Sequence, residues 1–310
     1  NTGHRIAGQQ AMRALPSEIP AWLRTPDAAF EVGELSREPD RAKGSGKTHE
    51  SDRDPGHFVD IDEQGRVLGG PPFSPMPPTR AEYETQLRAA GLDSWKAGYL
   101  QYSIVETVQH LAKDLGYWRA LDYAERRSAG GRRAWLRADR KRREALILVT
   151  VGALSHYVAD GAQPLHASVH FNGWGDYPNP DGFTQDKIHS AVDGELVIGG
   201  VTPAMVARRM APFRSCGCAV DVRAVDYLLA SEKQVRPLYE LRKAGALAAG
   251  DPRGTAFAAD RLAVGASELR DLIVEAWRTS ANVEVGWRPV KVSDVLAGRV
   301  DPYVALQGVD

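Results

Sequence analysis

Histidine and aspartate recur at the spacing of metal ligands in the middle of this sequence. His156 and Asp160 are four positions apart, which on an α-helix places them on one face, one turn apart. Gly161 can end that helix, and Pro164 prevents its simple continuation, so the chain can turn and bring His166 back. Two imidazoles and a carboxylate would then converge, and zinc takes these donors in proteins. The spacing also fits a His–Asp pair without metal, so this stretch alone leaves both interpretations open.

The same His-x-x-x-Asp spacing occurs a second time, at His189 and Asp193, again on a predicted helix. His57 lies in an irregular segment after Gly56, and His4 opens the first predicted helix. A single histidine in such a context is more often a hydrogen-bonded core or surface residue than a ligand. Two His-x-x-x-Asp pairs with further histidines nevertheless supply enough nitrogen and oxygen donors for more than one metal ion.

Taken in chain order, these motifs resemble those of a known superfamily. The matching pieces are Gly3-His4, His57-Phe-Val-Asp60, His156-x-x-x-Asp160-x-x-Gln163-Pro164-Leu165-His166 and His189-x-x-x-Asp193. They are similar to motifs of the tri-zinc nucleases of the S-one/P-one type and of the bacterial zinc-dependent phospholipases C. The resemblance spans residues 3–193, and residues 194–310 resemble the family only in being helical.

The resemblance implies three zinc sites with defined ligands. These would be His57, His156 and Asp160 with an upstream carboxylate for the first zinc, His166, His189 and Asp193 for the second, and His4 with the other oxygen of Asp160 for the third. Asp40 is the candidate for the upstream carboxylate, which would bridge the first two zincs, and Asp52 and Asp54 are alternatives. Asp40 and Lys43 are the candidate catalytic residues.

The start of the chain differs from the family pattern. The family opens Trp-Gly-x-x-Gly-His, and the free amine and carbonyl of that tryptophan ligate the third zinc. This sequence opens Asn1-Thr2-Gly3-His4. We expect that residues have been trimmed ahead of Asn1, and the alternative is a weakened third site. In the family, removal of a signal peptide exposes the tryptophan, so the resemblance implies a secreted or periplasmic protein.

The reaction implied by the resemblance is hydrolysis of a phosphate ester. Two zinc ions ~3.5–4 Å apart can lower the pKa of a bridging water, so that hydroxide attacks phosphorus. A third zinc can neutralise the departing alkoxide, so no protein general acid is required. We favour a single-strand-specific nuclease, because Asp193 stands where the phospholipase relatives usually carry glutamate. The opening Gly3-His4-Arg5-Ile6-Ala7 points the same way.

Aromatic side chains near the predicted ligands are candidates for substrate binding. Phe58 could stack a base and Asp60 could accept hydrogen bonds from its amino edge, which fits single-stranded nucleic acid or a nucleotide. In the alternative phospholipase C, the loop containing Trp174 and Tyr177 would cradle a choline head group by cation–π contact. The same aromatics could equally pack on the helices. A third alternative is a non-catalytic helical binding protein whose histidines are structural.

The elements that must position these residues are predicted to be helices. Helical periodicity covers residues 4–15, 17–24, 95–126, 134–160, 187–197, 203–210, 219–247 and 254–280. Residues 33–80 are polar and rich in proline and glycine, and such a long irregular segment is either disordered or functional. No run of alternating strands is present. We therefore predict one all-α domain, residues 1–310, a helical bundle of the zinc phospholipase C and S-one/P-one nuclease type.

Composition sets few further limits. The 310 residues are 43% hydrophobic and 25% charged with a formal net charge of −1, so no overall basic field indicates a nucleic-acid or membrane partner. Residues 145–154 form the most apolar stretch, which is too short to span a bilayer, and we expect a monomer without a transmembrane segment. Cys216 and Cys218 could form a small disulfide or remain thiols.

Overall fold

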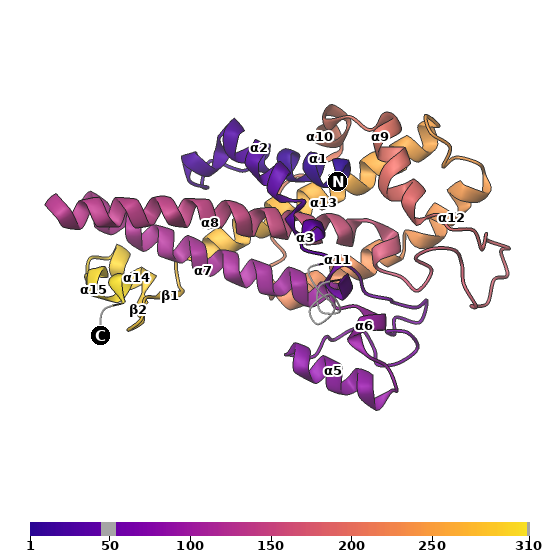
Figure 1. Ribbon diagram of the computed structural model, residues 1–310, viewed down its shortest axis with the longest axis horizontal. Coiled ribbons are helices and arrows are strands. Elements are labelled where there is room, and N and C mark those ends of the chain that lie inside the picture. The colour runs from indigo at the N-terminus through magenta and orange to yellow at the C-terminus, as the bar shows by residue number, and fades with distance from the viewer. Residues whose placement is uncertain (45–53, 309–310) are drawn as a thin grey trace.

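The computed structural model describes residues 1–44 and 54–308, and most of them are helical (Figure 1). The α-helices are α1 (Thr2–Arg13), α2 (Pro26–Leu35), α3 (Glu38–Arg41), α5 (Arg80–Ala89), α6 (Ser94–Ala97), α7 (Leu100–Arg126), α8 (Gly130–Ala162), α9 (Leu196–Gly200), α10 (Pro203–Arg209), α11 (Val220–Glu232), α12 (Val235–Lys243), α13 (Pro252–Thr279), α14 (Val292–Leu296) and α15 (Tyr303–Gln307). Shorter turns are the 3₁₀ elements η1 (Ala21–Arg24), η2 (Asp54–His57) and η3 (Pro164–His166) and the π-helical turn η4 (Ala191–Glu195). The predicted all-α class is confirmed.

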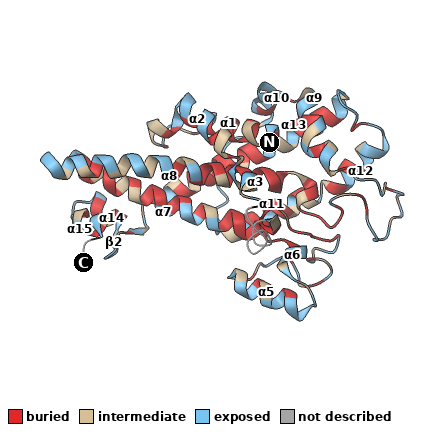
Figure 2. Ribbon diagram, viewed as in Figure 1, coloured by how far each residue is buried: buried red, intermediate tan, exposed pale blue. Residues whose placement is uncertain are grey.

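The two longest helices, α7 and α8, form an antiparallel pair joined by a short connection. Burial rises along α8, from an exposed, charged first half to a second half in the core (Figure 2). Helix α2 packs closely on that second half, because a Cβ at Gly152 would lie only 2.5 Å from Cβ of Leu35. Helix α13 crosses the pair, with Gly265 against Ala162. The C-terminal half of α8 is thereby held rigidly on several sides.

By length and composition alone, α8 could also cross a membrane. However, 61% of its most apolar window is buried inside the molecule. Core helices of soluble proteins pass the same test, so this property does not by itself indicate a membrane span.

Several predicted helices are interrupted or shorter than expected. The helix predicted at 95–126 is broken at Gly98, whose φ of 73° lies in the left-handed region, giving α6 and α7. The helix predicted at 219–247 divides into α11 and α12 at Lys233 and Gln234. Residues 187–197 contain the π-turn η4, and only the end of 17–24 is helical, as η1. Apolar periodicity does not detect such breaks, because both halves of a broken helix keep the same buried face.

The segment predicted to be irregular, residues 33–80, is more ordered than expected where it is described. It contains the end of α2, all of α3 and η2. Residues 59–72 are then tied down by isolated β-bridges, including Val59 to Gly98 and Ile61 to Val67. These bridges lay the segment across the start of α7, beside the end of α8.

The last part of the described chain forms a small unit at the other end of the α7–α8 pair (Figure 1). Strands β1 (Glu284–Val285) and β2 (Val290–Lys291) pair antiparallel and, with α14, pack on the second half of α7. In the exposed segment between α10 and α11, Cys216 and Cys218 form a disulfide. Of the two alternatives open from the sequence, the structure therefore contains the bonded form.

Candidate metal centre

The end of α8 carries the first candidate ligands, and the following turn brings the third one back. His156 Nε2 lies 3.1 Å from Asp160 Oδ2, one helical turn on. Helix α8 stops at Ala162 because Gln163 adopts an extended backbone (ψ 116°) ahead of Pro164. The turn η3 then places His166 Nδ1 4.0 Å from Asp160 Oδ1. The convergence predicted from the spacing is therefore present.

Eight ligand-type side chains gather around this helix end in three sets, and within each set the potential ligand atoms lie within 4.8 Å of one another. The sets are His4, His156 and Asp160; Asp40, His57 and His156; and His166, His189 and Asp193. Because the first two sets share His156, we call their five residues the inner group. We call the third set the outer group. All eight residues predicted as metal ligands therefore belong to one of the two groups.

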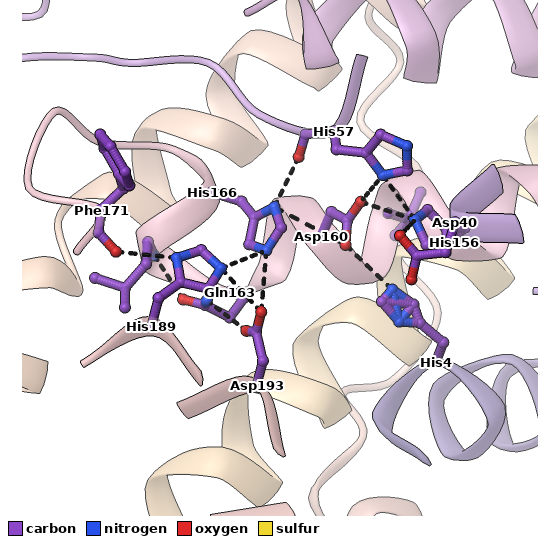
Figure 3. Close-up of polar contacts among 12 residues, drawn as sticks. His4, Asp40, His57, His156, Asp160, Gln163, His166, Phe171, His189 and Asp193 are labelled. Atoms are coloured by element: carbon purple, nitrogen blue, oxygen red, sulfur yellow. Dashed lines mark hydrogen bonds and ion pairs between the residues drawn. The ribbon is translucent and has the colours of Figure 1, made fainter. Parts of the chain in front are cut away.

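Asp160 occupies the centre of the inner group. Its Oδ1 lies 3.1 Å from His4 Nε2, and its Oδ2 lies 3.0 Å from His57 Nδ1. Figure 3 shows the carboxylate between the two histidine groups. The two oxygens of Asp160 therefore face different histidines, as expected for a carboxylate shared by two metal ions.

The outer group is built from the η3 turn and the short helical segment that contains η4. His189 Nε2 lies 2.9 Å from Asp193 Oδ2, which matches their four-residue spacing. His166 Nε2 completes the group, 3.2 Å from His189 Nε2 and 3.5 Å from Asp193 Oδ2. Gln163 Nε2 donates to the other oxygen of Asp193 at 2.7 Å. Gln163 thus orients Asp193, a function that its place in the motif did not reveal.

Backbone carbonyl groups fix the orientation of three imidazoles. The Nδ1 atoms of His156, His166 and His189 lie 2.7 Å from Ser36 O, 2.8 Å from His57 O and 2.9 Å from Phe171 O. A ring that donates its Nδ1–H to a carbonyl keeps its lone pair on Nε2 when neutral. The Nε2 lone pairs of His166 and His189 then face each other, which is repulsive unless a cation lies between them. The donor set therefore fits a metal ion.

Electrostatics favour positive charge at the same place. Burial raises the pKa of Asp160, but His156 and His166 outweigh this effect and hold the pKa well below its usual range. Burial lowers the pKa of His166, but Asp160 and Asp193 outweigh it and raise the pKa to about 9. Burial lowers the pKa of His4 to about 3, so this ring is neutral. Without a metal, His166 therefore carries a proton between the two carboxylates, and a bound metal ion would displace that proton and take over its positive charge.

Asp40, the predicted upstream carboxylate, lies beside the inner histidines. Asp40 Oδ1 lies 3.9 Å from His156 Nε2 and 3.0 Å from Lys43 Nζ, on the inner side of the centre. Among the described contacts, none joins Asp40 to the outer group, and the carboxylate between the groups is Asp160. The bridge by Asp40 between the first and second zincs therefore stays a prediction, and Asp40 lines the same cavity as the outer group. Asp54 belongs to neither group, and Asp52 lies outside the described residues.

Two cavities border the candidate metal centre. The first, which we call the α13 cavity, has a volume of about 230 Å³. All residues of the inner and outer groups line it apart from His57 and His156. Its other lining residues include Asn1, Lys43, Phe257, Arg261 and Leu262. The aromatic cavity, about 640 Å³, is lined by Lys43, Asp54, His57, Phe58, Asp60, Leu68, Trp95, Lys96, Leu165, His166, Phe171 and His189. Lys43, His166 and His189 line both cavities, so a long substrate could contact both while its reacting group lies at the metal centre.

Phe58 and Asp60, both predicted to bind substrate, line the aromatic cavity. The Phe58 ring lies over Gly98, where a Cβ would come within 2.7 Å of Phe58 Cδ2, so this contact requires glycine. Asp60 is buried, and burial raises the pKa of its carboxyl group to about 8. At neutral pH Asp60 therefore keeps its proton, so it can donate a hydrogen bond as well as accept one.

The other two predicted substrate-binding residues lie elsewhere. Trp174 is completely buried in the interior of its loop, stacked on His170 with ring centroids 3.7 Å apart. Trp174 therefore has no surface for a choline group, and we correct that expectation. Tyr177 is partly exposed and meets His170 edge-on, and it is not part of the lining of either cavity.

The sequence alone did not predict Trp95, which is 48% exposed and lines the aromatic cavity. Backbone contacts hold its helix, α6, against the Phe58 segment: Asp60 N donates to Ala97 O at 2.9 Å. No local motif marks this position. Trp95 lies three residues ahead of Gly98, where the helix predicted at 95–126 is interrupted.

Comparisons with known proteins assign no family to the chain. No protein-family model matches the sequence, and a search of curated proteins found no match. The interpretation of the site therefore depends on its own geometry and on the resemblance of its short motifs.

Proposed function

We propose that this protein is a zinc-dependent phosphodiesterase with the fold of the tri-zinc nucleases and zinc-dependent phospholipases C. The observation that carries the proposal is the convergence of carbonyl-anchored imidazoles on Asp160 and Asp193. Nitrogen and carboxylate donors without thiolates suit zinc in a hydrolytic site. Bound zinc would supply Lewis-acid chemistry, activating water and neutralising charge on the phosphoryl group and the leaving oxygen.

The protein's own residues have distinct functions in this proposal. The outer group would hold one zinc, with Gln163 fixing the angle of Asp193. The inner group would hold two, with Asp160 shared between them. Lys43, kept in place by Asp40, lines both cavities and offers a cation to an anionic substrate where the cavities meet. These residues would bind and orient a phosphodiester between the two groups.

The aromatic cavity supports a nuclease in preference to a phospholipase C. The faces of Phe58, Trp95 and Phe171 suit stacking with bases, and single-stranded nucleic acid is bound in this way. Asp60 can exchange hydrogen bonds with a base edge. Lys43 and Lys96 line the same cavity and would repel a choline cation. The proposed substrate is therefore single-stranded nucleic acid, and the Cys216–Cys218 disulfide fits an exported enzyme.

The metal can be tested by elemental analysis of the purified protein together with an activity panel. We expect two to three zincs per chain and hydrolysis of single-stranded DNA or RNA in preference to duplex DNA and phosphatidylcholine. Exhaustive chelation should abolish activity and lower the melting temperature, because a metal that binds only the native state stabilises it. Full activity after exhaustive chelation would refute the proposal.

The substrate class can be tested with Phe58→Ala. Loss of a stacking platform should cost about 1–3 kcal/mol of binding per stacked base, with little effect on a small base-free phosphodiester. Phe30→Ala, on the exposed face of α2, is the matched control and should change neither activity. Equal impairment of the base-free ester and the oligonucleotide by Phe58→Ala would instead favour the phospholipase C.

A further inference from the structure

Arg261 brings a cation to the metal centre from a part of the chain that carries none of the recognised motifs. It lies on α13 and lines the α13 cavity together with Asp160, Asp193 and Lys43. The motif resemblance ends at Asp193, so it assigns no function to this helix. The position of Arg261 follows from the packing of α13 across the end of α8.

The guanidinium of Arg261 is held in a fixed orientation. Its Nε donates to Ala162 O, the last residue of α8, at 2.7 Å, and its Nη2 donates to Ser231 Oγ on α11 at 3.4 Å. Both acceptors are neutral. Because α8, α11 and α13 all contribute to this arrangement, the side chain loses little further freedom when it binds a ligand.

No described carboxylate forms an ion pair with Arg261. The adjacent Asp260 pairs with Arg209 Nε at 2.8 Å. Arg223, also partly buried, pairs with Glu268 Oε1 at 2.6 Å. Partial burial of Arg261 without such a partner lowers its pKa and costs free energy unless a counter-charge arrives. The open cavity beside it is where that counter-charge can bind.

We propose that Arg261 binds a second phosphate group of the substrate, adjacent to the phosphodiester that is cleaved. The inference rests on the proposed function, because it takes the cleaved group to lie between the inner and outer groups. Arg261 is anchored at the α13 wall of the cavity, to one side of that position. Its planar guanidinium suits two-point binding of a phosphate, and nucleic acid supplies one such phosphate per nucleotide. Arg261 is thus a specificity-determining residue for oligonucleotides.

The test compares dinucleotides with one phosphodiester and no terminal phosphate against the same dinucleotides carrying a 5′- or a 3′-phosphate. We expect the wild type to prefer one phosphorylated form by about ten- to a hundredfold in kcat/KM, the effect of a charge-assisted contact. Arg261→Gln should abolish this preference and leave the unphosphorylated dinucleotide unchanged. Arg261→Lys should keep part of it, and Arg278→Gln, an exposed arginine at the other end of α13, should keep all of it.

Two further measurements separate this inference from the proposed function. Zinc content and melting temperature of Arg261→Gln should match those of the wild type. Calorimetric titration of the zinc-free protein with inorganic phosphate should show weaker binding to Arg261→Gln. If the wild type were inactive on every dinucleotide, the proposed phosphodiesterase function would be refuted. The difference in phosphate affinity between the wild type and Arg261→Gln would still test the proposed phosphate site. The inference is overturned if Arg261→Gln impairs all dinucleotides equally, or if the preference and phosphate binding persist.

Discussion

Two buried carboxylates, Glu125 and Asp160, lie at opposite ends of the α7–α8 pair. They differ in the side chains that balance their negative charge. Glu125 receives Arg137 Nε at 2.9 Å and Arg140 Nε at 2.7 Å. Burial raises the pKa of Glu125, but these two guanidinium groups outweigh the effect and lower it. Asp160 also has a lowered pKa, but its neighbours are imidazoles.

The difference between the two carboxylates separates a structural ion cluster from a binding site. An arginine keeps its charge at every physiological pH, so the charge of Glu125 is matched by the protein itself. An imidazole can gain or lose a proton, so the charge of Asp160 is matched only while a proton or a metal ion is held among its histidine neighbours. A lowered pKa alone therefore does not distinguish the two sites, and the identity of the partner does.

The largest effect should follow from removing the shared carboxylate. Asp160→Ala should lose more than one zinc and at least about a hundredfold of activity, the upper range for residues that merely support metal ligands. Asp160→Asn should also fail, because an amide oxygen carries no charge to offset the metal. Elemental analysis and turnover measure both effects. A variant that keeps its zinc and its turnover would show that Asp160, like Glu125, is only structural.

Gln163 tests whether the outer group depends on support from its surroundings. Gln163→Ala should lower the affinity for a single zinc by about 10–100-fold, because Asp193 loses the donor that orients it. The inner group should retain its metal. Titration with a chelator, followed by zinc release, should resolve one weakened site. Uniform weakening of all zincs would show that the two groups are not independent.

Glu125→Gln tests the other end of the comparison. The substitution removes the charged partner of Arg137 and one of the two carboxylates that pair with Arg140, which keeps Glu144. It should reduce the free energy of unfolding by about 1–3 kcal/mol. Zinc content and activity should remain unchanged, and urea denaturation measures the stability. The partly exposed Asp122, which pairs with the exposed Arg126, gives a control: Asp122→Asn should have a smaller effect. Zinc loss in Glu125→Gln would contradict the assignment of this cluster to stability alone.

Asp60 offers a buried carboxyl group that forms no ion pair with an arginine among the described residues. Burial raises the pKa of Asp60 in the folded protein to about 8, above the unfolded value of about 3.9. Its stabilising contribution is therefore complete below about pH 4 and is lost as pH rises towards about 8. Asp60→Asn should remove this pH dependence, which at about 1.4 kcal/mol per pH unit amounts to several kcal/mol by pH 8. Unchanged unfolding curves from pH 4 to 8 would contradict the raised pKa.

The sequence predicted the ligands better than their surroundings. Both His-x-x-x-Asp pairs depend on helical spacing, which is local, and the structure brings their side chains together. Asp40 does lie near His156, but its predicted bridging position depends on how α3 packs against α8, which no local spacing encodes. Trp174 was misjudged for the same reason: aromatic composition does not distinguish a loop's interior from its surface.

Residues that act across large sequence separations could not be predicted at all. Trp95 and Arg261 reach the metal centre through backbone contacts and helix packing that leave no spacing pattern. The break at Gly98, which separates α6 from α7, is visible only once Phe58 is seen lying over it. In each case tertiary contacts decide the position of the residue, and these contacts cannot be predicted from the spacing of residues in a single sequence.

The contacts of Asp160 also constrain the order in which this protein can be made and assembled. His4 and His57 are 156 and 103 residues away from Asp160 along the chain. Such pairings form late in folding, because long loops must close before they contribute any energy. Synthesis proceeds from the N-terminus at about 5–20 residues per second. His4 therefore cannot contact Asp160 until α8 has been made, and the outer group cannot form until Asp193 has been made. Zinc retention would therefore report that the chain has folded at least through Asp193, and pulse-labelled nascent chains ending before Asp193 should not hold the full metal complement.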